Sequence, residues 1–79
     1  MNYKYKIWGY FHGSICQNQI HFFKICEQYK EVDTLSFRCD YSGNFTFKIH
    51  SDEATLKRFL RDLSTVAKFQ ILKIKKVRR

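Results

Sequence analysis

Proline is absent from this chain, and only three of its 79 residues are glycine. Flexible linkers, disordered tails and low-complexity segments are rich in such residues, so their scarcity excludes these segments. No apolar run approaches the roughly 20 residues that a membrane-spanning helix needs. The first eleven residues alternate and contain lysines, so they lack the continuous apolar stretch of a signal peptide. We therefore expect one cytoplasmic domain, residues 1–79, with no membrane contact.

Cysteine is scarce as well, and its three positions, Cys16, Cys26 and Cys39, form no CxxC pair. An odd number of cysteines at this spacing argues against a disulfide framework and against a structural zinc site. His21 and His50 show no metal-ligand spacing with any cysteine or carboxylate. We expect the cysteines to pack as small hydrophobic side chains, and we expect no metal and no cofactor.

Acidic residues are few: seven Asp and Glu stand against 15 Lys and Arg, which leaves a formal net charge of +8. Such a surplus attracts polyanions through long-range electrostatics and counterion release, although it also serves solubility. Part of it lies in a C-terminal run made of Lys73, Lys75, Lys76, Arg78 and Arg79. On an edge strand, lysines also discourage edge-to-edge aggregation.

Aromatic residues are abundant, at 18% of the chain, and they supply the large side chains that so short a domain needs for its core. Residues 3–11 alternate between a Tyr-, Ile- and Phe-rich side and a side with Lys and Trp, which predicts a strand. Residues 15–30 carry apolar side chains at helical spacing, which predicts a helix with Ser14 as its N-cap.

Residues 34–50 predict a β-hairpin, because apolar and polar residues alternate on both sides of a short polar turn. Leu35, Phe37 and Cys39 are expected on the core side. Gly43 supplies the positive φ that a hairpin connection needs.

Residues 52–66 predict a second helix with Ser51 as its N-cap, and residues 68–77 predict a last strand. The alternation of that strand breaks near Leu72, where we expect a bulge. The predicted order is therefore β-α-β-β-α-β. Two helices that cover one face of a four-stranded antiparallel sheet form the α+β sandwich of ferredoxin-like folds.

The face of the sheet that the helices leave bare is the first candidate functional surface. We expect it to combine cations with exposed aromatic rings, namely Lys4, Lys6, Trp8, Tyr10, Arg38 and Lys48. Phosphates pair with Lys and Arg while bases stack on rings, so this pattern suits a nucleic acid. An acidic protein surface is the other anionic partner. In the alternative, Trp8 and Tyr10 mark a protein-interaction or assembly surface, with oligomers formed through the sheet face or an edge strand.

The loop between the first strand and the first helix is the second candidate. A glycine turn that leads into a helix N-terminus directs backbone N–H groups toward one point, which predicts an anion-binding loop. The loop comprises His12, Gly13, Ser14, Ile15, Cys16 and Gln17. Cys16, Cys39 and His12 are expected near it, but the sequence offers no third group that would orient a Cys-His nucleophile.

This loop resembles the acylphosphatase signature G-x-V-Q-G-V-x-F-R, which lies between the first strand and first helix of the same fold. Gly9 and Gly13 match it with the right spacing. Residues 39–45 are similar to a later family segment, N-x-x-D-G-x-V, with Gly43 kept. The resemblance covers nearly the whole chain and implies a ferredoxin-like domain with a phosphate-binding loop.

Two positions depart from that family. Gln17 stands where the family has an Arg that binds phosphate, and Cys39 stands where it has an Asn that positions the attacking water. These changes remove a bidentate phosphate contact and an orienting group. We therefore predict a non-catalytic, acylphosphatase-like module that holds an anionic partner through its basic face and loop. The alternative is an acylphosphatase that hydrolyses a carboxyl-phosphate bond with a rewired site, where Arg38 or Lys48 binds the phosphate.

Overall fold

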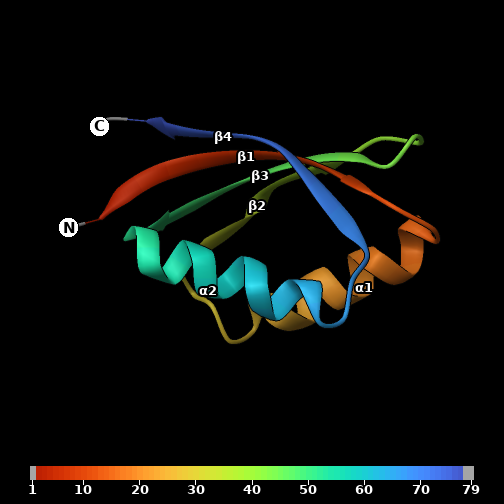
Figure 1. Ribbon diagram of the computed structural model, residues 1–79, viewed down its shortest axis with the longest axis horizontal. Helices are drawn as coiled ribbons and strands as arrows, with labels where there is room; N and C mark the ends of the chain where they lie inside the picture. Colours follow the sequence, from red (N-terminus) through yellow and green to blue (C-terminus); the bar gives the residue numbers. More distant parts are fainter. Residues whose placement is uncertain (1, 78–79) are drawn as a thin grey trace.

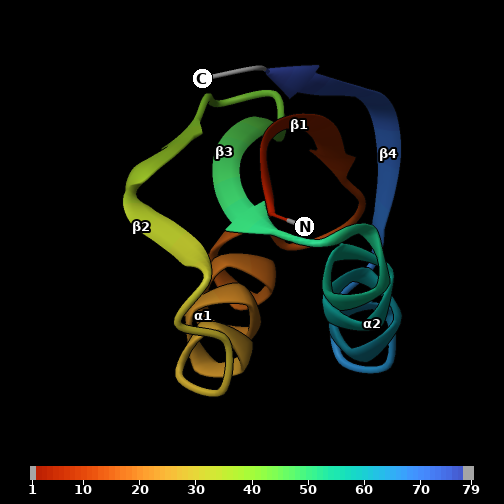
Figure 2. The same ribbon diagram turned by 90° about the vertical axis from the view of Figure 1, so that its left-hand side faces the viewer.

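The computed structural model describes residues 2–77, which form one sheet covered on one side by two helices (Figure 1). The elements are β1 Tyr3–Phe11, α1 Ile15–Cys26, β2 Val32–Cys39, β3 Asn44–Ser51, α2 Glu53–Ser64 and β4 Phe69–Val77. The strands lie in the order β2-β3-β1-β4, and each neighbouring pair is antiparallel. Figure 2 shows the helices side by side beneath the sheet. The predicted topology and the single helix-covered face are confirmed, whereas Arg78 and Arg79 lie outside the described residues.

The core between the sheet and the helices is built largely from phenylalanine. Phe22 of α1 lies at its centre, with ring centroids 5.1 Å from Phe47 of β3 and 5.9 Å from Phe59 of α2. Every second residue of β1 faces this core, and Ile7 and Phe11 are among the buried ones, as the alternation of the strand predicted. Within residues 2–77, neither helix is long and apolar enough to cross a membrane.

The first helix is shorter than the predicted range of residues 15–30. It ends at Cys26, and the following N–H groups donate to carbonyls three residues back, which tightens the chain into turns. Tyr29 is nevertheless buried, because these turns keep it on the core side of the helix.

The N-cap of α2 is Asp52, and the predicted cap Ser51 is wrong. Asp52 Oδ1 accepts a hydrogen bond from the Thr55 N–H at 2.8 Å. Ser51 is instead the last residue of β3, and its buried hydroxyl donates to the Asp52 carbonyl at 2.8 Å. Pairing with β1 keeps Ser51 in the strand, so the next residue with a capping side chain begins the helix.

The bulge predicted near Leu72 is confirmed. Trp8 and Gly9 of β1 pair with residues of β4 that are two apart, so Leu72 lies between those partners without one of its own. Residues beyond a bulge change their alternation relative to the residues before it. Lys73 and Lys75 therefore lie on the same side of the sheet as Trp8.

The first half of β2 departs from the predicted alternation, because residues 34–37 lie opposite a single residue of β3. Leu35 belongs to this irregularity and is 86% exposed, so its predicted place in the core is wrong. The Ser36 hydroxyl takes the role of a backbone acceptor, since it accepts from the Lys48 N–H at 2.8 Å. It also donates to the Asp33 carbonyl at 2.6 Å, which holds the irregular segment together.

The second half of β2 follows the prediction. Phe37 and Cys39 pack against the core, and the Phe37 ring lies 4.6 Å from Phe22 and 5.1 Å from Phe23. In the turn that follows, Gly43 has a φ of +100°, as the hairpin required.

Candidate functional site

The open face of the sheet, on the side away from the helices, carries rows of side chains that cross β3, β1 and β4. Paired residues of antiparallel strands point to the same side, so the register defines these rows. Three of them are Lys48–Lys6–Lys75, Thr46–Trp8–Lys73 and His50–Lys4–Val77. The residues that alternate with them along β1 are buried beneath the sheet, so this face is distinct from the core.

Positive charge is concentrated on the open face. Its strand positions hold six Lys or Arg residues and one acidic residue, Asp33. The rest of residues 2–77 holds seven Lys or Arg and six acidic residues, so it is close to neutral. Both ion pairs of the described residues, Lys57–Glu53 and Arg61–Asp62, lie on α2. The cations of the open face are therefore not paired with carboxylates inside the described part of the protein.

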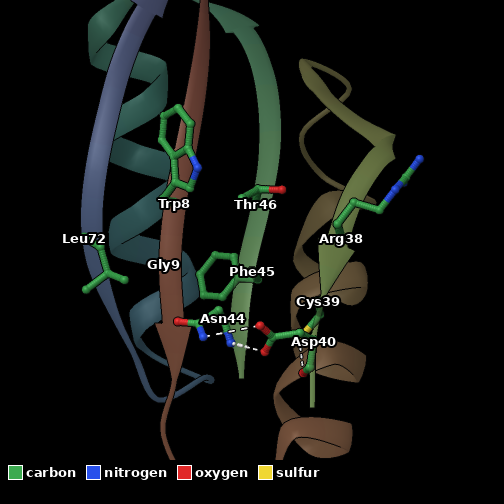
Figure 3. Close-up of a pocket in the computed structure, with 9 residues that line it drawn as sticks. All are labelled: Trp8, Gly9, Arg38, Cys39, Asp40, Asn44, Phe45, Thr46 and Leu72. Atoms are coloured by element: carbon green, nitrogen blue, oxygen red, sulfur yellow. Dashed lines mark hydrogen bonds between the residues drawn. The ribbon is translucent and has the colours of Figure 1, made fainter. Parts of the chain in front are cut away.

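Five of the six surface residues predicted from the sequence meet on this face: Lys4, Lys6, Trp8, Tyr10 and Lys48. Arg38 belongs to the same face by register, but its guanidinium points away from Trp8 (Figure 3). Its Nη1 donates to the carbonyls of Leu35 and Phe37 at 2.9 and 2.8 Å. The irregularity of β2 exposes these carbonyls, and so it draws the Arg38 side chain to the edge of the sheet.

Two lysine ammonium groups lie close to the Trp8 ring. The Nζ atoms of Lys6 and Lys73 are each 5.0 Å from the centroid of its ring, which is a cation–π distance. The predicted surface included Lys6 but left out Lys73 and Lys75. The predicted bulge near Leu72 was the signal for Lys73 and Lys75, because a bulge moves the residues that follow it to the other side of the sheet.

A hollow of about 440 Å³ opens on the open face beside Trp8 (Figure 3). Trp8 of β1 and Leu72 of β4 supply its apolar walls, and Thr46 and Asn44 of β3 supply polar groups. Its volume falls within the range of about 300–1,000 Å³ that is typical of small-molecule sites. Its lining residues come from all four strands, so no single segment of the sequence predicts it.

The turn between β2 and β3 forms one end of this hollow and is held by Asp40. Its carboxylate accepts from the Ser42 N–H at 2.9 Å, and from the backbone and side-chain amides of Asn44 at 3.0 and 3.3 Å. Desolvation opposes the ionised carboxylate, but the hydrogen bonds from Asn44, Ser42 and Gly43 outweigh it and lower the pKa of Asp40. The same contacts orient the Asn44 amide at the rim.

The predicted anion-binding loop, His12 to Gln17, is held in place by internal hydrogen bonds. Ser14 is the N-cap of α1, as predicted, and its hydroxyl accepts from the Gln17 N–H at 3.2 Å. The buried Asn18 side chain donates to the His12 carbonyl at 2.7 Å and accepts from the Lys68 N–H at 3.0 Å. Asn18 was not predicted as a site residue, although it precedes Phe22 by one helical turn on the apolar side. Anion binding by this loop stays a prediction.

The two glycines that carry the acylphosphatase resemblance each have a structural reason. A Cβ atom at Gly9 would lie 2.3 Å from the Phe45 ring, and Gly13 has a φ of +79°. Gln17 and Cys39, which stand at the family's catalytic positions, line two different hollows on the surface of the domain. They do not converge on one site, and the acylphosphatase family is not confirmed.

The cysteines of the described chain are free thiols in three environments: Cys16 is exposed, Cys39 is half-buried and Cys26 is buried. Burial raises the pKa of the Cys26 thiol to about 12, so this side chain behaves as a core residue. No group of three His, Cys, Asp or Glu side chains in residues 2–77 is arranged to hold a metal ion.

Comparison with known proteins identifies the fold. No protein-family model matches the sequence, and no curated protein matches it significantly. The chain is similar to a solved structure assigned as a C-terminal regulatory domain of aspartate kinase from Porphyromonas gingivalis W83, with a TM-score of 0.63. The fold is ferredoxin-like. The likeness covers 96% of this chain and 53% of that one, so this chain spans about half of it, and the 17% identity shows the fold alone.

Proposed function

We propose that this domain is a non-catalytic binding module that holds a polyanionic partner on the open face of its sheet. The observation that carries the proposal is the row Lys48–Lys6–Lys75, in which Lys6 has a lysine directly opposite on each side. Like charges in these positions destabilise a sheet. A bound polyanion relieves this repulsion and releases the counterions of both partners, so binding is favoured at this row.

The distribution of charge supports binding over a general role in solubility. Solubility is served by charge of either sign spread over a surface. Here the side of the domain that carries the helices is close to neutral, and the surplus lies on the open face. A one-sided positive field steers an anionic partner to that face.

The same charges argue against the two alternatives. A second copy docked face to face would bring two lysine rows together, which disfavours self-association through this surface. A rewired acylphosphatase site needs Arg38 or Lys48 at the loop, but the Arg38 guanidinium binds carbonyls of β2 and Lys48 lies in the lysine row. The solved neighbour is itself assigned as a regulatory domain, which accords with a binding role.

The proposal is tested by measuring binding to polyanions as a function of salt concentration. The probes are a 20-nucleotide single-stranded DNA, inorganic polyphosphate and heparin. We expect all three to bind at low salt, with a log–log slope of about −0.7 per phosphate contact on the single strand. The double variant Lys6→Gln/Lys75→Gln should bind more weakly and reduce the size of the slope by about 1.4 on the same basis.

The matched control is Lys24→Gln/Lys30→Gln, which removes the same charge from exposed positions on the helix side. It should retain most of the affinity. Equal losses in the two double variants would mean that net charge, and not this face, governs binding. An absence of binding to every probe at low salt would overturn the proposal.

A further inference from the structure

The hollow beside Trp8 adds a second recognition element to the basic face. From its walls, its polar atoms and its neighbouring cations, we infer that the polyanion is a single-stranded nucleic acid with one base seated in this hollow. The inference rests on the proposed function, and it adds the class of polyanion and the place where a base is held.

The walls of the hollow suit a flat, mostly apolar ring. Trp8 presents an aromatic surface, and Leu72, which is 54% exposed, stands across from it on β4. Leu72 is the extra residue of the bulge, between the partners of Gly9 and Trp8, and its side chain lies on the open face beside Trp8 (Figure 3). A base stacked on the Trp8 ring would remove apolar surface of Trp8 and Leu72 from water, which a partner that offers charge alone would not do.

Polar atoms at the rim suit the edge of a base. Asn44 donates its side-chain N–H to Asp40, and its amide oxygen has no hydrogen-bond partner among residues 2–77. The Thr46 hydroxyl likewise makes no hydrogen bond within the described chain. A carbonyl oxygen and a hydroxyl can together accept from and donate to the polar edge of an unpaired base.

The cations lie where the phosphates of the same strand would run. The Nζ atoms of Lys6 and Lys73 each lie 5.0 Å from the centroid of the Trp8 ring, and the row Lys48–Lys6–Lys75 crosses the sheet two residues along β1 from Trp8. Two residues of a strand span about 7 Å, so a base in the hollow keeps its neighbouring phosphates within reach of lysine side chains.

Other polyanions satisfy only part of this surface. An acidic peptide pairs its carboxylates with the lysines but has no flat ring to place between Trp8 and Leu72. A nucleic-acid duplex keeps its bases stacked within the helix, so it presents phosphates alone to the hollow. A single strand supplies both groups at once.

The first test uses the fluorescence of the unmodified protein, because Trp8 is the single tryptophan of the chain. The probes are a twelve-nucleotide oligothymidine, an abasic sugar-phosphate chain of the same length, the matching duplex and polyglutamate. We expect oligothymidine to quench Trp8 and to bind more tightly than the abasic chain. Quenching by the abasic chain or by polyglutamate to the same extent would overturn the inference.

The second test uses variants of the hollow. Trp8→Leu should lower the affinity for oligothymidine by roughly 5- to 150-fold and leave the affinity for the abasic chain unchanged. Thr46→Val, which keeps the shape of the side chain, should reduce the preference for oligothymidine without unfolding the sheet. The control is Tyr41→Leu, which removes a fully exposed ring outside the hollow and should have no effect.

The two proposals fail in different ways. If oligothymidine and the abasic chain bind equally and both depend on Lys6 and Lys75, the base site is wrong and the polyanion-binding face stands. If none of the four probes binds at low salt, both the proposed function and the base site are wrong.

Discussion

The ring of Phe45 occupies the space that a Cβ atom at Gly9 would need, with the ring atom Cζ only 2.3 Å from that position. Phe45 cannot move away easily, because its ring stacks on Phe11 with centroids 4.2 Å apart. This contact pins β3 against β1 directly beneath the hollow that Trp8 lines. The fold and the candidate site therefore depend on the same glycine.

Gly9→Ala should destabilise the domain by about 1–3 kcal/mol, because an overpacked core forces side chains and backbone to shift. Urea unfolding followed by far-UV circular dichroism measures the change. Adding Phe45→Leu should recover part of the loss, so the two substitutions should be non-additive. A Gly9→Ala protein as stable as the parent would show that the ring does not lie against this position.

Ser36→Ala should cost about 1 kcal/mol, because it removes the acceptor of the Lys48 N–H and the donor to the Asp33 carbonyl. The control is Leu35→Ser, which changes an 86% exposed neighbour and should alter stability by less than about 0.5 kcal/mol. Thermal unfolding of both variants compares them directly. A larger loss for Leu35→Ser than for Ser36→Ala would contradict the observed irregularity of β2.

Asp52→Ala should destabilise α2 by about 1 kcal/mol through loss of the N-cap, whereas Asp52→Asn should cost much less. Hydrogen bonds from Thr55 lower the pKa of Asp52 below its unfolded value, so its ionised form stabilises the folded state. That contribution is complete above the unfolded pKa of about 3.9 and is lost as the pH falls through the folded pKa. Urea unfolding at pH 7 and below pH 4 should therefore show a smaller decline for Asp52→Ala than for the parent.

Cys26 should react with thiol reagents far more slowly than Cys16. Burial raises its pKa to about 12, so almost no thiolate is present at pH 8, while Cys16 is exposed at the start of α1. Labelling with iodoacetamide followed by peptide mass spectrometry distinguishes the two sites. Denaturant should bring Cys26 to the rate of Cys16, and rapid labelling of Cys26 in the native protein would contradict its burial.

Lys6→Gln should raise stability at low ionic strength while it weakens polyanion binding. Removing the central lysine relieves repulsion with Lys48 and Lys75, at about 0.2–1 kcal/mol per pair. Salt should reduce the gain, since it screens exposed charges. Unfolding curves at 10 and 500 mM salt measure the effect. A loss of stability at both salt concentrations would show that the three lysines do not destabilise the free protein by repulsion.

Much of the fold could be predicted because it depends on local periodicity. The alternation of β1, the helical spacing of α1 and α2, and the break near Leu72 are all visible within single segments. Tight turns are equally local, so Gly43 and the Ser14 cap were also correct. These features reflect the geometry of a backbone with its own side chains.

The errors arose where a residue's surroundings come from elsewhere in the chain. Leu35 has the spacing of a core residue, yet β2 is an edge strand, and pairing on one side alone tolerates the irregularity that exposes it. Asn18 looks like a surface residue until the chain after α2 brings the Lys68 N–H to its side chain. Ser51 precedes the predicted helix and has a capping side chain, but it pairs with Tyr3 of β1 and therefore belongs to the sheet.

By itself, the sequence determined the order of the elements, the face of the sheet that the helices cover, and the excess of positive charge, because each follows from residue type and spacing. Only the tertiary structure decided that Lys6 lies between two other lysines, and that Trp8, Leu72 and Asn44 line one hollow. Strand pairing brings together residues that are far apart along the chain, and its register depends on the packing of the whole core. The site is therefore a property of the assembled sheet, whereas its ingredients are already present in the sequence.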